Sequence, residues 1–393
     1  MLEPTGARAG AVRRWVASSI PPMAPLVDPG FWRDRAVLLT GHTGFKGAWL
    51  ALWLQSMGAR VTGLADGVPT QPSLYELASV KRGLEADVRA DVRDHAAVLA
   101  AFATHAPEIV IHMAAQSLVR RSFADPRATY ETNVMGTVNV LETVRATPSV
   151  RVVVNITSDK CYDNFAAREP RPFVEDDPKG GHDPYSNSKG CAELVADAYL
   201  RSFFAAGGAE ADGPRLGSAR AGNVIGGGDW GADRLIPDIM AGALAGALIP
   251  IRNPEAVRPW QHVLNPLSGY LRLAELLHAS AEHQGGWNFG PALDDARPVR
   301  WIADRLTQLW PGELRWELDS DPPTPHPHEA HFLALDSTKA RERLGWAPAW
   351  ELEQTLAAIV DWYRSLGAGE DLRAVTLAQI ERFAASPARA IQS

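Results

Sequence analysis

Short apolar runs alternate with longer stretches of mixed apolar and polar positions through the first half of the chain. The apolar runs have strand length and are rich in Val, Ile and Leu; they span residues 36–40, 59–64, 108–112 and 150–156. The mixed stretches have helical length and cover residues 48–57, which is amphipathic, 96–105 and 126–145. Alternating strands and helices predict a parallel sheet with helices on both faces. We therefore expect an α/β fold with a doubly wound, Rossmann-like sheet.

A glycine-rich turn, Gly-His-Thr-Gly-Phe-Lys-Gly, separates the first apolar run from the first mixed stretch. Gly41 allows a tight turn, Gly44 lets the backbone approach a pyrophosphate, and Gly47 lets helix and strand pack closely. The free N–H groups at the helix start face such a phosphate. The turn residues expected to contact a dinucleotide are Gly41, Thr43, Gly44, Phe45, Lys46 and Gly47. The spacing is GxxGxxG rather than GxGxxG, so a strand–helix turn without a ligand is the alternative.

Other candidate residues lie where further strands end or on the helix that follows. Ligands of doubly wound sheets bind beyond the carboxyl ends of the strands, so residues distant in sequence converge there. These candidates are Asp91, Val92, Ala114, Ala115, Gln116, Asn133, Thr157 and Ser158. The residue that holds the adenosine ribose is less defined, because Ala65 occupies the usual acidic position and Asp66 follows it. Asp66 is either the ribose ligand or a plain loop acid. No Arg sits immediately there to accept a 2′-phosphate, which favours NAD over NADP.

Tyr185 and Lys189 form the clearest catalytic candidate. Asp183 suits the N-cap of a helix and Pro184 its first position, so residues four apart in this helix share one face. A tyrosine with a pKa of about 10 is a poor base. A lysine ammonium beside it, together with a cationic nicotinamide, is expected to lower that pKa and favour the phenolate. The alternative is an ordinary pair on a helix surface, since YxxxK also occurs by chance.

Composition narrows the class of protein. The chain has 393 residues, a formal net charge of −7 and 22% charged residues, which argues against a nucleic-acid or membrane-surface role built on bulk charge. It contains no apolar run of about 18 residues that would predict a transmembrane helix. Two cysteines, Cys161 and Cys191, are too few for a disulfide framework, so a reducing, cytoplasmic location is expected. Residues 1–30 mix Arg and Pro without an apolar core and are predicted to be a disordered extension.

Together these motifs resemble the extended short-chain dehydrogenase/reductase family. The resemblance covers residues 31–366 and rests on the glycine turn, Asp91-Val92, Ala114-Ala115, Asn133, Ser158, Tyr185 and Lys189. It implies an NAD-dependent, homo-oligomeric enzyme that acts on a nucleotide sugar. In that family the hydroxyl at position 158 and Tyr185 hold the substrate oxygen, while Lys189 orients the nicotinamide ribose. The expected division is a mainly NAD-binding domain over 31–220, a smaller substrate-binding lobe mainly over 221–366, and a C-terminal helix or tail over 367–393.

The residues after Ser158 narrow the activity that the resemblance implies. Nucleotide-sugar 4,6-dehydratases place an acid–base pair at the positions of Asp159 and Lys160, whereas 4-epimerases need only the hydroxyl residue, Tyr and Lys. The dTDP-glucose and GDP-mannose branches have Glu where this chain has Lys160. The stretches 41–47, 158–162 and 220–230 are similar to the branch that acts on CDP-glucose. The resemblance therefore implies C4 oxidation, loss of water across C5–C6 and hydride return to C6. A surface ion pair is the alternative for Asp159 and Lys160.

The resemblance also supplies candidate substrate contacts. They are Gln116, Ser158, Asn223, Arg234 and Arg258. A planar guanidinium suits a diphosphate, which favours a role for the two arginines. His326, His328 and His331 lie in a Pro-rich stretch without helical spacing, so no metal site is expected. Three alternatives stay open: a dTDP- or GDP-hexose 4,6-dehydratase, a nucleotide-sugar 4-epimerase or 4-dehydrogenase, and an NAD-holding sensor without turnover.

Overall fold

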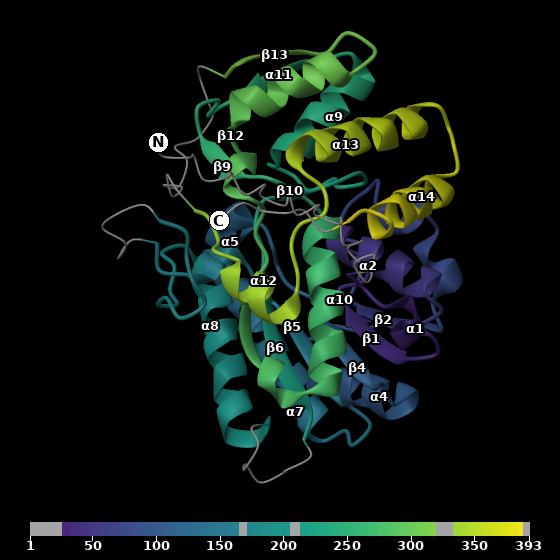
Figure 1. Ribbon diagram of the computed structural model, residues 1–393, viewed down its shortest axis with the longest axis vertical. Coiled ribbons are helices and arrows are strands. Elements are labelled where there is room, and N and C mark those ends of the chain that lie inside the picture. The colour runs from purple at the N-terminus through teal and green to yellow at the C-terminus, as the bar shows by residue number, and fades with distance from the viewer. Residues whose placement is uncertain (1–25, 165–170, 205–212, 320–332, 388–393) are drawn as a thin grey trace, which may run out of the picture.

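The computed structural model describes residues 26–164, 171–204, 213–319 and 333–387, with a seven-stranded sheet at its centre (Figure 1). The strands lie in the order β11-β6-β5-β4-β1-β2-β3, and every neighbouring pair is parallel. In chain order they are β1 (Ala36–Thr40), β2 (Arg60–Ala65), β3 (Ala86–Arg89), β4 (Ile109–His112), β5 (Val152–Ile156), β6 (Arg215–Arg220) and β11 (Gly285–Asn288). Because the order runs outward from β1 in both directions, the sheet is doubly wound. The predicted fold is confirmed.

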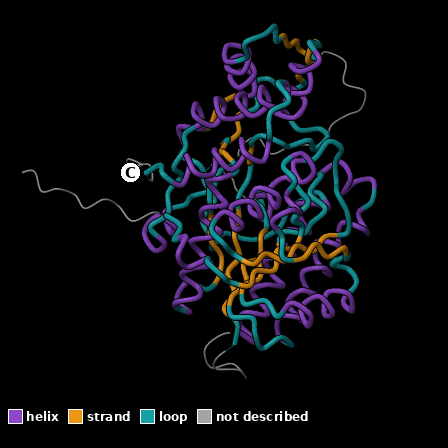
Figure 2. The backbone as a smooth tube through the Cα atoms, turned by 90° about the vertical axis from the view of Figure 1, so that its right-hand side faces the viewer, coloured by secondary structure: helices purple, strands orange, loops and turns teal. Residues whose placement is uncertain are grey.

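Helices cover both faces of this sheet because successive side chains of a strand point to opposite sides. Val37 and Leu39 of β1 pack in one hydrophobic core with α2 (Phe45–Ser56) and α10 (Leu264–Ala279). Leu38, between them, packs in a second core with α4 (His95–His105) and α7 (Gly136–Arg145). Figure 2 shows the strands, in orange, running between helices. Burial on both faces explains why the strands read as unbroken apolar runs in the sequence.

The remaining helices differ widely in length. They are α1 (Pro29–Trp32), α3 (Leu74–Leu77), α5 (Val119–Ala124), α6 (Pro126–Tyr130), α8 (Pro184–Tyr199), α9 (Leu235–Ala245), α11 (Val299–Leu309), α12 (Thr338–Leu344), α13 (Leu352–Gly367) and α14 (Leu372–Ala384).

A smaller lobe formed by the C-terminal half lies beyond one end of the sheet, at the top of Figure 1. Its helices α9, α11 and α13 are joined by two short strand pairs, β8 (Leu248–Ile251) with β13 (Arg315–Leu318) and β9 (Val257–Pro259) with β12 (Ala296–Pro298). Between β9 and β12 the chain returns to the sheet, through α10 and β11. Strands β7 (Val224–Ile225) and β10 (Gln261–His262) also pair with each other. The lobe is therefore built from more than one segment of the chain.

Helix α2 departs from its predicted pattern. The sequence predicts an amphipathic helix over 48–57, but the helix begins at Phe45 and residues 47–54 are all buried. Its face away from the sheet is covered by C-terminal helices: Trp53 packs edge-on against Phe383 of α14, with ring centroids 5.6 Å apart. The prediction of an amphipathic helix is wrong because residues 47–54 contain no charged or amide side chain and because distant helices cover the second face.

Residues 26–30, which the sequence predicts to be part of a disordered extension, have a defined place in the structure. Val27 is buried, and the backbone nitrogen of Asp28 donates to Oε1 of Glu275 on α10 at 2.9 Å. The Asp28 carboxylate also caps α1, and Trp32 Nε1 donates to the same oxygen of Glu275 at 2.8 Å. Residues 26–30 therefore pack on the folded protein, and residues 1–25 lie outside the described part of the chain.

Candidate active site

The glycine turn follows β1 directly, and each of its three glycines meets a different need. Gly41 has a φ of 72°, and a Cβ there would lie 2.8 Å from the backbone nitrogen of Ala114. A Cβ on Gly47 would lie 2.1 Å from the carbonyl oxygen of Gly41. At Gly44, the N-cap of α2, the nearest atom to such a Cβ is 3.5 Å away. The open side of the turn is thus at Gly44, where the unpaired N–H groups of α2 begin, and this cradle fits the pyrophosphate of NAD.

The non-glycine residues of the turn fix it to its surroundings. Thr43 is buried, and its hydroxyl donates to the carbonyl oxygen of Gly67 in the loop after β2 at 2.6 Å. Phe45 is half-buried at the start of α2. Lys46 points instead toward α10, where Nζ donates to the Tyr270 hydroxyl at 3.0 Å.

Thr40, the last residue of β1, holds the end of the neighbouring strand β4 beside this turn. Its hydroxyl oxygen accepts from the backbone nitrogens of Met113 and Ala114, at 3.0 Å each, and is hydrogen bonded to His112 Nδ1 at 2.7 Å. Burial lowers the pKa of His112 to about 3, so the imidazole is neutral. The polar residue that ends β1 therefore places Ala114 against Gly41.

The strand end at Asp91, which the sequence predicts to contact the dinucleotide, carries a positive charge that the sequence did not reveal. An open hollow of about 360 Å³ is lined by Asp91, Arg93, Asp94 and Glu131. Asp91 and Arg93 are hydrogen bonded through their side chains at 2.5 and 2.9 Å, which raises the pKa of Arg93; Glu131 and the exposed Asp66 add to this effect. The sequence places no Arg beside Asp66, whereas the structure does. The other three residues that line the hollow, Asp91, Asp94 and Glu131, are acidic and offset the charge of Arg93.

The helix predicted over 126–145 is interrupted by a π-helical turn, Glu131–Met135, between α6 and α7. Such bulges are frequent at functional sites. This one carries Asn133, and Val92 is buried near Gly136, just after it, where a Cβ would lie 2.8 Å from Val92 Cγ2. Val92 therefore packs the sheet end against α7.

Asn133 and Gln116 use their amides to hold the backbone near the site. Asn133 accepts from the Gln116 nitrogen at 2.8 Å and donates to Ser188 Oγ on α8 at 2.8 Å. Gln116 Oε1 accepts from the Leu118 nitrogen, and its Nε2 donates to the Leu118 carbonyl oxygen. Ala115 lies half-buried beside them. Because these amides are engaged within the protein, both residues shape the strand end.

Tyr185 and Lys189 lie on one buried face of α8 as predicted, and Asp183 caps this helix by accepting from the Ser186 nitrogen. Tyr185 is hydrogen bonded through its side chain to Ser158. Lys189 Nζ lies 3.4 Å from the carbonyl oxygen of Ile156 at the end of β5. The fold thus brings the hydroxyl residue, the tyrosine and the lysine into one buried cluster.

The expected lowering of the tyrosine pKa does not occur in the protein alone. Burial raises the pKa of Tyr185 to about 12, and the bond to Ser158 only partly offsets this. Burial also lowers the pKa of Lys189 to about 8, opposed by Glu193. The prediction joins Lys189 with a cationic nicotinamide; among the protein's own groups, desolvation of the phenolate outweighs the neighbouring charges.

Asp159 lies at the centre of the cluster. Its carboxyl accepts from Ser158 Oγ at 2.9 Å, and burial raises its pKa, opposed by Lys160, Ser158 and Lys46. A raised pKa favours the protonated carboxyl, which is the form a general acid needs. Lys160 is half-buried beside it. The surface ion pair considered for these two residues is excluded, because Asp159 is only 4% exposed.

Lys46 and Tyr270 belong to this cluster, although the sequence assigns Lys46 to the cofactor turn and does not single out Tyr270. Burial lowers the pKa of Lys46 to about 7, and the charges of Lys189 and Arg234 act in the same direction. Tyr270 is buried, its pKa is raised by burial, and Asp159 and Tyr185 raise it further. No sequence motif marks Tyr270, since it reads as an apolar position of α10.

The candidate diphosphate contacts lie on the lobe side. Asn223 follows β6 with a φ of 48°. Arg234 donates to both carboxylate oxygens of Asp229, at 2.9 and 3.0 Å, and to Ser117 Oγ at 3.3 Å. Its charge acts on Tyr185, so it lies near the catalytic cluster. Arg258 is half-buried on β9.

Two further arginines, which the sequence analysis does not single out, lie in the same region. Arg120 of α5 forms an ion pair with Asp233 at 2.9 Å, and Arg252 lies 3.7 Å from the same carboxylate. Both are close to Asp238, whose pKa is raised to about 6 by burial. Only the fold brings α5 and the loop after β8 together, so no local pattern could have indicated these residues.

No group of His, Cys, Asp and Glu that could hold a metal ion occurs among the residues that the structure describes. His326, His328 and His331, considered as ligands from the sequence, lie outside the described residues.

Comparison with known proteins shows the family of this chain. Residues 37–290 match the NAD dependent epimerase/dehydratase family. The chain belongs to this family. A relative in the same family, the CDP-glucose 4,6-dehydratase of Salmonella typhimurium, is 49% identical over 369 residues, which is 93% of this chain and 100% of the relative. The dTDP-glucose 4,6-dehydratase of Xanthomonas campestris is 30% identical and covers 83% of this chain and 92% of the relative.

Solved structures of epimerases and dehydratases share the fold. The UDP-glucose 4-epimerase of Thermotoga maritima, solved with UDP-glucose, has a TM-score of 0.70 at 21% identity and covers 84% of this chain and 99% of its own. The dTDP-glucose 4,6-dehydratase of Streptomyces venezuelae, solved with NAD, has a TM-score of 0.69 at 23% identity, with 86% and 99% covered. NAD is therefore the cofactor expected of this fold, in agreement with the glycine cradle.

Proposed function

We propose that this protein is a CDP-glucose 4,6-dehydratase, which converts CDP-D-glucose to CDP-4-dehydro-6-deoxy-D-glucose. The observation that carries the proposal is the buried Asp159 with Lys160 beside it, directly after the hydroxyl residue Ser158 and next to Tyr185. An oxidation at C4 needs only the hydroxyl residue, Tyr185 and Lys189. A second acid and base are needed only where water is also removed. The 49% identity to a CDP-glucose 4,6-dehydratase supports the choice of nucleotide.

The residues that would hold NAD follow from the cradle. The backbone from Gly41 to Gly47 would bind the pyrophosphate, and the strand end with Asp91 and Val92 would border the adenosine. Lys189 would orient the nicotinamide ribose. When bound, NAD accepts hydride from C4 of the hexose and returns it to C6, so no external reductant is consumed.

In the first step Tyr185 removes the proton of the 4-hydroxyl while Ser158 holds the same oxygen through its hydroxyl. Because burial raises the pKa of Tyr185 to about 12 in the protein alone, the phenolate must gain positive charge from its surroundings before it can act at neutral pH. Arg234 already lowers that pKa.

In the second step the new 4-keto group acidifies H5, and Lys160 removes it; Lys160 returns a proton to C5 when hydride is delivered to C6. Asp159 protonates the departing 6-hydroxyl, a role that its raised pKa favours. The two residues are adjacent in sequence and follow the end of β5, so they can address neighbouring carbons of one hexose. The diphosphate would be held by Arg234, Arg258 and Asn223 on the lobe side.

Incubation with CDP-, dTDP- and GDP-linked hexoses tests the proposal. We expect mass spectrometry to show the loss of one water from CDP-glucose. Turnover of the dTDP- and GDP-linked hexoses should be slower by at least about tenfold, which is equivalent to roughly 1.4 kcal/mol of transition-state binding. Faster turnover of a dTDP or GDP substrate would reassign the nucleotide. A product of unchanged mass would favour a 4-epimerase, in which Asp159 and Lys160 have no task. No turnover of any sugar nucleotide would favour a sensor.

The cellular setting is also part of the proposal. No helix in the described part of the chain is long and apolar enough to cross a membrane. We place the protein in the cytoplasm because its substrate class is a nucleotide sugar and its two cysteines are not paired with each other. We expect a homo-oligomer, which light scattering on the purified protein measures directly. A monomeric mass at micromolar concentration would contradict this expectation.

A further inference from the structure

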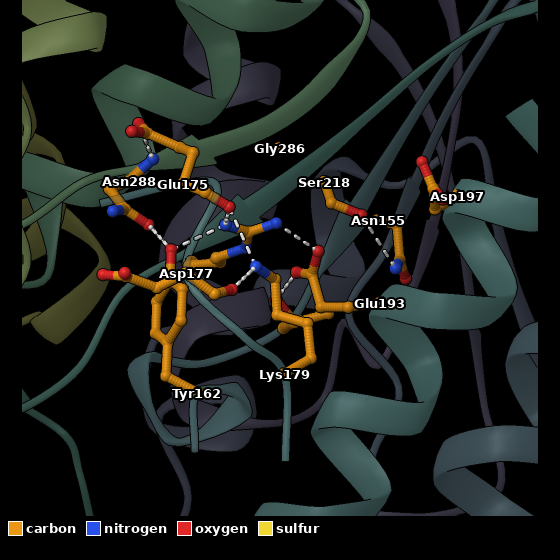
Figure 3. Close-up of polar contacts among 12 residues, drawn as sticks. Asn155, Tyr162, Glu175, Asp177, Lys179, Glu193, Asp197, Ser218, Gly286 and Asn288 are labelled. Atoms are coloured by element: carbon orange, nitrogen blue, oxygen red, sulfur yellow. Dashed lines mark hydrogen bonds and ion pairs between the residues drawn. The ribbon is translucent and has the colours of Figure 1, made fainter. Parts of the chain in front are cut away.

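One buried ion pair holds both ends of the turn that carries the catalytic residues. Arg220, at the end of β6, and Glu193, on α8, lie 2.6 Å apart and are each about 5% exposed. Thr157, just before Ser158, donates its hydroxyl to Glu193. Tyr162, just after the turn Asp159–Cys161, accepts from Arg220 Nη1 at 2.6 Å. Figure 3 shows Tyr162 and Glu193 directed toward the same guanidinium.

The same pair connects the turn to the helix of the tyrosine and lysine. Glu193 lies four residues after Lys189 and eight after Tyr185, so the three side chains share one face of α8. The charge of Glu193 acts on Lys189. The Arg220–Glu193 pair therefore links β5, α8 and β6 at the points where they contribute to the catalytic cluster.

Further contacts keep the guanidinium in one orientation. Arg220 donates to the carbonyl oxygen of Glu175 at 3.0 Å, and Tyr162 donates to Asn288 Oδ1 at 2.7 Å. A Cβ on Gly286 would lie 2.2 Å from Arg220 Nη2, so the glycine leaves room for the guanidinium.

Stability alone does not require such a pair. Burying two charges is costly, and well-packed apolar residues of similar volume often serve as well or better. A pair that connects the flanks of a catalytic turn has a specific use, since a displacement of about 1 Å can cost about a hundredfold in rate.

We propose that Glu193 and Arg220 are positioning residues for the elimination step. By holding Thr157 and Tyr162, they set where Asp159 and Lys160 lie relative to C5 and C6 of the hexose. The proposal rests on the proposed function for its chemistry, and its structural half can be tested without substrate.

Glu193→Gln keeps the shape of the side chain and removes its charge, and Thr157→Val removes one hydroxyl at nearly constant volume. With CDP-glucose we expect kcat for dehydration to fall by about tenfold to a hundredfold, with KM within about twofold because the nucleotide contacts lie elsewhere. Oxidation at C4, followed in a single turnover by nicotinamide absorbance, should slow less than elimination. The variants should therefore accumulate the 4-keto intermediate that still carries its 6-hydroxyl.

Ser218→Ala is the matched control. Ser218 is buried two residues before Arg220, and its Oγ accepts from Asn155 Nδ2 at 3.3 Å, a bond that involves neither member of the ion pair nor the turn (Figure 3). Ser218→Ala should lower the melting temperature without changing the ratio of the rates of oxidation and elimination. If Glu193→Gln and Thr157→Val behave like Ser218→Ala, or slow both steps equally, the pair is merely structural and the proposal fails.

Hydrogen exchange separates this proposal from the proposed function. In Glu193→Gln, the peptide spanning residues 157–163 should exchange faster than in the wild type and in Ser218→Ala. Unchanged protection would overturn the positioning role even if the wild type dehydrates CDP-glucose. Conversely, the wild type could fail to dehydrate any sugar nucleotide while Glu193→Gln still exchanges faster. That outcome would refute the proposed function but support the role of the Arg220–Glu193 pair in holding the turn.

Discussion

The carboxylate of Asp159 lies directly against the backbone of Gly222. A Cβ at position 222 would be 1.8 Å from Asp159 Oδ2, so any other residue there must displace the carboxylate. Gly222 follows β6 by two residues and Asp159 follows β5 by three, and the two strands are neighbours in the sheet. The carboxylate of Asp159, the acid of the proposed elimination, thus occupies the space that a side chain at position 222 would fill.

Gly222→Ala should therefore slow elimination by about tenfold or more while C4 oxidation changes less, because only Asp159 is displaced. Gly367→Ala, at the end of α13, is the control, since its Cβ would meet only Leu244 at an ordinary 3.4 Å. Rapid quench with product analysis separates the two steps. Full dehydration by Gly222→Ala would show that the carboxylate is not needed where the structure places it.

Two glycines of the cofactor turn should respond differently to substitution. Gly44→Val puts a side chain on the open side of the turn, so NAD affinity should fall by about tenfold or more with little change in melting temperature. Gly47→Ala puts a Cβ 2.1 Å from the Gly41 carbonyl oxygen, so it should lower the melting temperature by several degrees. Calorimetric titration and thermal unfolding measure both. Normal NAD affinity in Gly44→Val would mean that the pyrophosphate lies elsewhere.

Hydride should move within one substrate molecule. Deuterium at C4 of CDP-glucose should reappear at C6 of the product, and H5 should be replaced from solvent because Lys160 exchanges its proton. Lys160→Ala should slow elimination more than oxidation and accumulate the 4-keto intermediate that still carries its 6-hydroxyl. Tyr185→Phe should instead stop the first step, oxidation at C4. Mass spectrometry and NMR of the product follow each label. Recovery of the C4 deuterium in free NADH, without a 6-deoxy product, would favour a plain dehydrogenase.

Stability should fall as the pH drops below neutrality, in part because of two buried histidines. Burial lowers the pKa of His112 and His262 to about 3. Between the ordinary value of about 6.5 and this value, the unfolded chain binds more protons than the folded one, so the free energy of unfolding decreases as pH falls. The upper limit is about 1.4 kcal/mol per pH unit for each histidine. Urea unfolding at several pH values should give a shallower slope for His262→Asn than for the exposed control His95→Asn. Equal slopes would contradict the burial of a neutral His262.

The N-terminal segment should tolerate deletion only up to the residues that pack. Removing residues 1–22 should leave activity and melting temperature nearly unchanged, because the segment has no periodic apolar face. Removing residues 1–30 also removes Val27 and the Asp28 bond to Glu275, and should lower the melting temperature by on the order of 2–5 °C. A loss of several degrees in the shorter deletion would show that residues 1–22 pack on the protein.

Some of this protein could be read from local patterns. The run 36–40 became β1 without change of bounds, and the helix at Asp183 begins as predicted, because a buried strand and a capped helix are specified by adjacent residues. The face of α8 could also have revealed Glu193, the third member of the series that starts with Tyr185 and Lys189. Its acidic side chain, eight residues after the candidate catalytic Tyr185, was the one available signal.

Sequence alone predicted the alternation of strands and helices over residues 36–156, the glycine turn and the candidate residues of the catalytic set, since each depends on near neighbours in the chain. The tertiary structure decided which distant side chains complete that set: Tyr270 beside Lys46, Gly222 against Asp159, and Arg220 paired with Glu193. It also decided the pKa values, because burial rather than a neighbouring charge dominates at Tyr185. Contacts between separate strands and the loss of water around a side chain arise only when the chain has folded.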